Sequence, residues 1–162
     1  MGGVVVPMAE PSGWHESLRT FLILELGFEA RRSKLPLKIH PGILCKLDQK
    51  DGRRPDLIVI NRQMWIEATR VEAALSIPPD LTIEIVSTNW EDDYQQKAKG
   101  CAAFGVQEYW IVDPLEEKAT ICTLQAGLYN LEEFRNNDRL QSPTFPELNL
   151  TVAQILSGRA EG

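Results

Sequence analysis

Two acidic residues stand where a buried strand ordinarily carries only Val, Ile or Leu. Asp56 heads the apolar segment 56–60, and Glu84 lies inside the apolar segment 81–86. Moving an ionised carboxylate out of water costs on the order of several kcal/mol unless the charge is paired or binds a metal. Two such acids on two short strands indicate a site, and hydrolysis assisted by a divalent metal is the chemistry that suits them best.

The spacing within the second strand limits which acids can act together. Side chains alternate along a strand, so Glu84 shares a face with Thr82, and Asp56 can converge with it if the two strands are neighbours. Mg²⁺ commonly takes one or two carboxylates and completes its shell with waters and phosphate oxygens. Asp80 lies four residues before Glu84, roughly 13 Å along a strand. We therefore expect Asp56 and Glu84, without Asp80, to hold one ion.

A lysine follows on the helix predicted over 90–104. Asp93, Lys97, Cys101 and Phe104 recur at spacings of four, four and three residues, which places them on one helical face. Cys101 and Phe104 are apolar and should face the core, so Lys97 is carried inward with them. There it could orient the attacking water and stabilise negative charge, with Asp93 as its helical partner. The alternative is an ordinary surface ion pair between Asp93 and Lys97.

Structural alternatives stand beside the other candidates. Asp56 could simply cap a turn, and Glu84 could form a salt bridge with Arg53 or Lys97. His15 and Glu16, near the start of the first predicted helix, are interpreted as exposed or capping residues, with Glu16 as an additional metal ligand in the alternative interpretation.

Composition bounds the function further. The chain has 162 residues, 43% hydrophobic and 25% charged, with a net charge of −6 and a pI near 5.0. These values indicate a globular protein and argue against one that binds nucleic acid non-specifically over its surface. They are compatible with a local phosphate-binding site. Basic residues gather at 31–38 and again at Arg53 and Arg54. Either cluster alone is typical of a solvated face, and Arg53 and Arg54 are the candidates for phosphate binding.

Cysteine usage and hydropathy suggest a compartment. The three cysteines are odd in number and widely spaced, which fits neither a zinc site nor a disulfide framework. No apolar run approaches the roughly 18 residues of a membrane helix, and the first residues lack the pattern of a signal peptide. We therefore expect a cytoplasmic protein.

The pattern of elements predicts an α/β fold with a mixed β-sheet flanked by helices. We expect a loose tail over 1–13 and a single domain over 14–162. The elements predicted within that domain are a helix over 14–26 ending at Gly27, one or two strands over 35–47, a turn over 48–54, strands over 56–60 and 81–86 with a helix or irregular excursion at 64–75 between them, a helix over 90–104 stopped by Gly105, a strand over 109–112, a hairpin over 118–131 around Gly127, and a terminal helix over 148–156.

Four segments in this order resemble a known family. They are RPDL at 54–57, PDLTIEIVS at 79–87, the 93–97 stretch and GVQEYWIVDP at 105–114. Together they resemble the Uma-type restriction endonucleases of the PD-(D/E)xK nuclease superfamily, over roughly residues 14–155. The resemblance implies a restriction-endonuclease-like core, Mg²⁺ or Mn²⁺ as cofactor and DNA as substrate.

Carried over to this sequence, the resemblance assigns roles to individual residues. Asp56 matches the acid of the PD motif, Glu84 matches the second acid, and the backbone carbonyl of Ile85 would be a further metal ligand. Val86 stands where the superfamily has lysine. In this family the lysine is taken to have moved to the following helix, where Lys97 matches.

Two functions from different classes follow from these residues. The first is metal-dependent hydrolysis of DNA phosphodiester bonds by Asp56, Glu84 and Lys97. The second is a catalytically inactive module that keeps the fold to bind nucleic acid or a protein partner. The acidic segment 88–92 argues against tight phosphate binding, but neither it nor the displaced lysine favours inactivity as such, because all three catalytic positions are filled. The oligomeric state stays open, and relatives of this size make a homodimer plausible.

Overall fold

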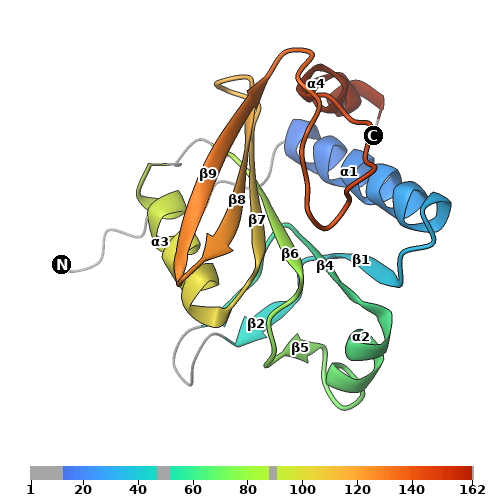
Figure 1. Cartoon of the computed structure of the whole chain (residues 1–162), viewed down its shortest axis with the longest axis vertical. Coiled ribbons are helices and arrows are strands. Elements are labelled where there is room, and N and C mark those ends of the chain that lie inside the picture. The colour runs from blue at the N-terminus through green and yellow to red at the C-terminus, as the bar shows by residue number, and fades with distance from the viewer. Residues whose placement is uncertain (1–12, 47–51, 88–90, 162) are drawn as a thin grey trace.

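The computed structural model describes residues 13–46, 52–87 and 91–161 (Figure 1). Its elements in chain order are α1 (Gly13–Arg32), β1 (Leu37–Pro41), β2 (Leu44–Lys46), β3 (Gly52–Arg53), β4 (Leu57–Asn61), α2 (Arg62–Ala68), β5 (Ala74–Leu75), β6 (Leu81–Ile85), α3 (Glu91–Phe104), β7 (Glu108–Asp113), β8 (Lys118–Gln125), β9 (Leu128–Arg135) and α4 (Val152–Glu161). The predicted tail lies outside the described residues except for Gly13, which is the first residue of α1.

A six-stranded mixed sheet forms the centre of the molecule, as the sequence predicts. Its order is β1-β4-β6-β7-β8-β9, with β6 and β7 parallel and every other neighbouring pair antiparallel. Helices α1 and α4 pack together on one face of this sheet, and α3 lies against the other face (Figure 1). The apolar runs of β4, β6 and β7 are buried because helices cover both faces.

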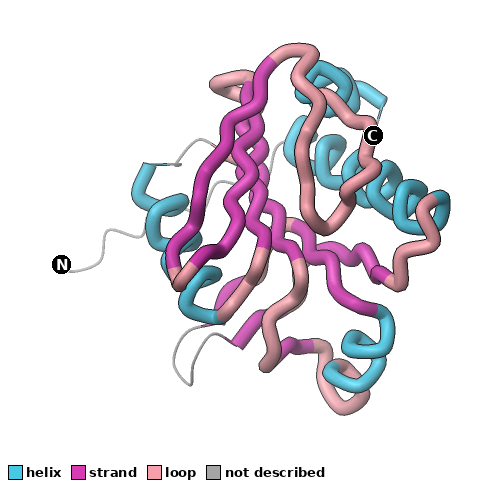
Figure 2. Tube along the Cα trace, in the orientation of Figure 1, coloured by secondary structure: helices cyan, strands magenta, loops and turns pink. Residues whose placement is uncertain are grey.

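A second, smaller sheet lies beside the first. Its order is β3-β2-β5, and together with α2 it packs against Ile58 and Ile60 of β4 (Figure 2). The strand pair expected over 35–47 is confirmed, although its two strands join different sheets. In the expected turn at 48–54, residues 48–51 lie outside the description, and residues 52–53 form β3 instead of a turn. The uncertain segment 64–75 contains both α2 and β5.

Two predicted helix boundaries are wrong. Helix α1 continues through Gly27 to Arg32, because Glu29 and Ala30 are buried and Arg32 donates two hydrogen bonds to Glu29. This packing outweighs the roughly 1 kcal/mol that a helical glycine costs relative to alanine. The terminal helix begins at Val152 and not at residue 148.

A capping box sets the start of α4. The hydroxyl of Thr151 accepts a hydrogen bond from the Gln154 N–H at 3.2 Å, and the Gln154 side chain accepts one from the Thr151 N–H at 2.9 Å.

Glycine positions account for two predicted boundaries that are confirmed. Gly105 has a φ of +94°, and the N–H groups of Gly105 and Val106 bond back to carbonyls in the last turn of α3. This arrangement ends a helix with a left-handed residue. Ala126 and Gly127, with φ of +50° and +80°, form the two-residue turn between β8 and β9.

The described cysteines Cys45, Cys101 and Cys122 are free and buried, as expected for small core residues. Among the described residues, no helix combines the length and apolar character needed to cross a membrane.

Candidate active site

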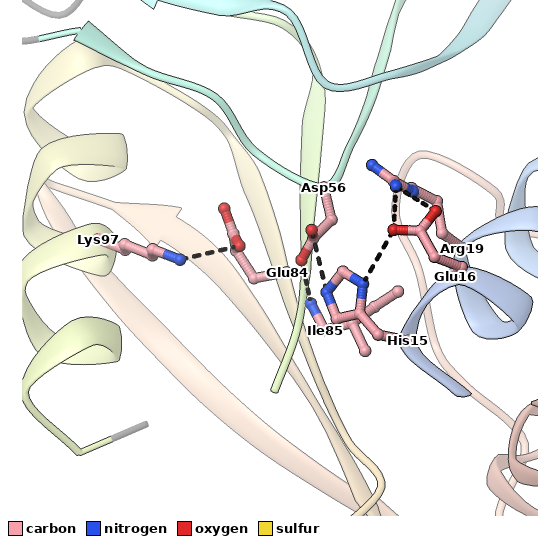
Figure 3. A network of polar contacts seen from close by, with 7 residues as sticks. All are labelled: His15, Glu16, Arg19, Asp56, Glu84, Ile85 and Lys97. Atoms are coloured by element: carbon pink, nitrogen blue, oxygen red, sulfur yellow. Dashed lines mark hydrogen bonds and ion pairs between the residues drawn. The ribbon is translucent and has the colours of Figure 1, made fainter. Parts of the chain in front are cut away.

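The two acids of the sequence prediction meet at one end of the β4–β6 pair. These strands are antiparallel with Leu57 opposite Ile83, so Asp56 lies next to Glu84. The side chain of Asp56 is 17% exposed, and one of its oxygens accepts a hydrogen bond from the Ile85 N–H at 2.8 Å (Figure 3). The backbone of β6 therefore fixes the orientation of the first acid.

Glu84 lies on the α3 face of the sheet, and Lys97 reaches it from that helix. Glu84 is 7% exposed, and the Lys97 Nζ donates a hydrogen bond to its Oε2 at 3.1 Å (Figure 3). Cys101, one turn after Lys97, is buried and lies 3.7 Å from the hydroxyl of Thr82. The inward orientation of Lys97 that helical spacing predicted is therefore present.

The environment pushes the pKa values of the two carboxyl groups apart. Burial alone would raise the pKa of Asp56, but hydrogen bonds from His15 and the Ile85 N–H outweigh it and lower that pKa. Burial and the adjacent Asp56 charge raise the pKa of Glu84 to about 8, against the opposing effect of Lys97. A pair with one ionised and one proton-retaining acid is typical of sites that bind a cation or transfer protons.

His15 is a site residue that the sequence interpretation missed. Its side chain is only 11% exposed, and its Nε2 donates to the Asp56 Oδ1 at 3.1 Å (Figure 3). The hydrogen bond to Asp56 raises the pKa of His15. A signal was present in the spacing, because His15 precedes the buried Leu18 and Leu22 by three and seven residues on the same face of α1.

Glu16 lies at the margin of this network. Its side chain is 46% exposed and pairs with Arg19, while its Oε1 lies 3.8 Å from the His15 Nδ1 (Figure 3). The capping or solvent-exposed interpretation describes its surroundings better than the alternative of a metal ligand, since Arg19 already neutralises it.

The remaining candidates are placed as follows. Arg53 is half-buried in β3, and Arg54 after it is exposed. The side chain of Asp93 lies outside the described part of α3. Asp80 is exposed and accepts a hydrogen bond from the Asn61 N–H at 2.9 Å, away from the ion-binding candidates.

The two carboxylates suit a divalent cation that keeps several water molecules as ligands. Each carboxylate oxygen has two lone pairs, so the bonds to His15, Ile85 and Lys97 leave acceptor capacity on both acids. No group of three or more His, Cys, Asp or Glu side chains in the described ranges is arranged to hold a metal. The donor set therefore fits Mg²⁺ or Mn²⁺, which keep several waters, better than it fits zinc.

Comparison with known proteins identifies the family. The Uma2 family model, described as "Putative restriction endonuclease", matches residues 1–153. The chain belongs to the Uma2 family. No curated protein is significantly similar to it. The resemblance seen in the four sequence segments is thus confirmed.

A solved structure shares the fold of this Uma2 protein. The crystal structure of "a putative nuclease belonging to DUF820 from Anabaena variabilis ATCC 29413" superposes with a TM-score of 0.78 at 20% sequence identity, covering 93% of this chain and 84% of that chain. At this identity the likeness shows the fold alone, and it confirms the predicted mixed sheet flanked by helices. The family description supports a nuclease function in general.

Proposed function

We propose that this Uma2 protein is an endonuclease that hydrolyses DNA phosphodiester bonds with Mg²⁺ or Mn²⁺. One observation carries the proposal: the half-buried Asp56 and the buried Glu84 lie side by side on neighbouring strands, Lys97 reaches them from α3, and the pKa of Glu84 is raised to about 8. A buried acid that close to another acid favours any cation that enters between them.

Asp56 and Glu84 would hold the metal ion, and the Ile85 carbonyl is a further candidate ligand. When bound, the ion would neutralise charge on the scissile phosphate and make a coordinated water easier to deprotonate. The Ile85 N–H and His15 hold Asp56 in one orientation, which reduces the reorganisation needed for binding.

In this proposal Lys97 acts at the scissile phosphate. Its ammonium is carried by a helix that packs on the same face of the sheet as Glu84. With a cation held by Asp56 and Glu84, Lys97 could orient the attacking water or stabilise the negative charge that builds on the phosphate. Arg53, half-buried in β3, and the exposed Arg54 are the candidates for binding a neighbouring phosphate. A homodimer and a cytoplasmic location stay predictions.

The experiment compares DNA cleavage by matched pairs of variants. Plasmid and single-stranded DNA are incubated with Mg²⁺ or Mn²⁺ and wild type, Asp56→Ala, Glu84→Ala or Lys97→Ala. Asp80→Ala controls for the first acid because it also follows proline but is exposed, and Lys99→Ala controls for the lysine because it is exposed on the same helix. We expect loss of cleavage in the three site variants alone.

Two outcomes would contradict the proposal in different ways. Cleavage that survives all three site substitutions would place the reaction elsewhere. An absence of cleavage by the wild type, together with no rise in its melting temperature on adding Mn²⁺, would favour the catalytically inactive binding module.

A further inference from the structure

A groove lies between α1 and β1, at the edge of the central sheet. Its volume is about 420 Å³, and its lining includes Gly27, Arg31, Leu35, Leu37, Lys38 and Arg62. Strand β1 ends the order of the six-stranded sheet, so the groove follows an open strand edge. Helix α1 and strand β1 lie side by side (Figure 1).

Positive charge gathers around this groove without local neutralisation. Arg31, Lys38 and Arg62 line it, and Lys34 lies in the turn between its two walls. None of the four forms an ion pair with another described residue, whereas the nearby Glu29 is neutralised by Arg32. The chain as a whole carries a charge of −6. Like charges that gather against such a background raise the local concentration of anions.

Gly27 is an independent indication that a ligand approaches the groove. Glycine is the least favourable residue after proline in a helix interior. A Cβ added at Gly27 would meet no atom within 4 Å, and its backbone is not in the left-handed region, so neither packing nor conformation requires glycine there. Its absence of a side chain leaves the backbone of α1 open on the groove wall.

The groove is connected to the active site by α1 itself. His15 contacts Asp56 at the start of this helix, and Arg31 lines the groove 16 residues later. A helix rises about 1.5 Å per residue, so the two positions are about 24 Å apart. Duplex DNA advances about 3.4 Å per base pair, and the groove would then meet the backbone about seven base pairs from the reacting phosphate.

We propose that the α1–β1 groove binds the phosphate backbone of duplex DNA outside the catalytic centre. The inference rests on the proposed function in taking DNA as the ligand. Because the contacts are to phosphates, they add affinity without base specificity and depend on salt. They also account for DNA binding by a protein whose overall charge is negative.

The test measures binding of a labelled 20-base-pair duplex in EDTA by fluorescence anisotropy, between 50 and 200 mM salt. The groove variant is Arg31→Ala/Lys38→Ala/Arg62→Ala. Its control, Lys46→Ala/Arg70→Ala/Arg135→Ala, removes the same charge from β2, the α2–β5 loop and β9. We expect at least a tenfold loss of affinity in the groove variant. The negative slope of log K against log salt should become shallower by about 2.7, because three phosphate contacts are lost. Equal changes in both variants, or no duplex binding by the wild type, would overturn the proposal.

A second variant separates binding from folding and from net charge. Gly27→Leu replaces a poor helix former by a good one and fills the groove without changing charge. We expect its melting temperature to rise while its duplex affinity falls, with Gly27→Ala between it and the wild type. A Gly27→Leu protein that binds with wild-type affinity would also contradict the proposal.

The groove and the proposed reaction can fail separately. If Asp56→Ala abolishes cleavage but the groove variant binds like its control, the reaction stands and the groove does not. If no cleavage occurs but the groove variant loses duplex binding, the groove stands and the reaction does not.

Discussion

Glu84 and Glu108 are buried glutamates on neighbouring parallel strands, yet their surroundings differ completely. Glu108 is 2% exposed and accepts hydrogen bonds from Trp110 Nε1, from the Ser142 hydroxyl at 2.6 Å, and from the Thr144 N–H and hydroxyl at 2.9 Å. Four donors satisfy its oxygens without any cation. This acid fastens the 142–144 segment to the start of β7.

Glu84 is buried almost as deeply but has no comparable set of donors among the described residues. It lies beside the carboxyl group of Asp56 and accepts a hydrogen bond from the Lys97 Nζ. Its burial is therefore unfavourable to folding unless a proton or a cation joins it. The comparison teaches that the number of neutral donors around a buried acid, more than burial itself, separates a structural carboxylate from a candidate site.

The largest expected effect is on cleavage. Glu84→Gln keeps the size of the side chain but removes the charge that would hold the ion. We expect it to lower cleavage by about 10³-fold or more, with circular dichroism and melting unchanged or improved. Glu84→Gln with wild-type cleavage would remove Glu84 from the site.

The second effect is on stability and concerns Glu108, the structural glutamate. Glu108→Ala leaves the donors of Trp110, Ser142 and Thr144 buried without an acceptor. We expect a loss of about 3 kcal/mol in the free energy of unfolding, measured by urea denaturation. A Glu108→Ala protein as stable as the wild type would show that these hydrogen bonds do not fasten the segment.

A third, intermediate effect concerns His15. Removing the hydrogen bond that orients Asp56 should weaken Mn²⁺ binding and cleavage by about 10- to 100-fold, as expected for a group that orients a metal ligand. His40→Ala is the control, because His40 packs against Trp65 with tilted rings whose centroids are 4.6 Å apart and is not among the residues that contact Asp56 in the described structure. Equal losses in both variants would mean that His15 acts only through stability.

The smallest effect is the pH dependence of stability in metal-free protein. The folded-state pKa of Glu84, about 8, lies above its ordinary value of 4.5. Its contribution to stability is therefore fully present below about pH 4.5 and is lost as pH rises toward 8. Between pH 6 and 8 we expect the wild type to lose about 1 to 2 kcal/mol more than Glu84→Gln, measured by urea denaturation at each pH. Parallel pH profiles would contradict a raised pKa.

Much of this site could be predicted from sequence because its signals are local. The β-branched runs of β4 and β6 mark strands buried on both faces, and the acids stand out against them. Helical spacing placed Lys97 on the inward face with Cys101. These inferences needed only the periods of strand and helix.

The missed features depend on contacts between distant segments. His15 reaches Asp56 across 41 residues of sequence, which no spacing rule foresees. Strands β3 and β5 are two residues long, too short for a periodic signal. The helix passes Gly27 because packing at Glu29 and Ala30 outweighs local propensity. The groove became visible only when α1 and β1 were placed side by side.

The central claim, that Asp56 and Glu84 hold a divalent cation which Lys97 does not bind, is tested most directly by calorimetric titration of Mn²⁺ into the metal-free protein. We predict one ion per chain in the wild type and in Lys97→Ala, and no binding at that site in Asp56→Ala or Glu84→Gln. Binding with unchanged stoichiometry and affinity in both acid variants would contradict the claim.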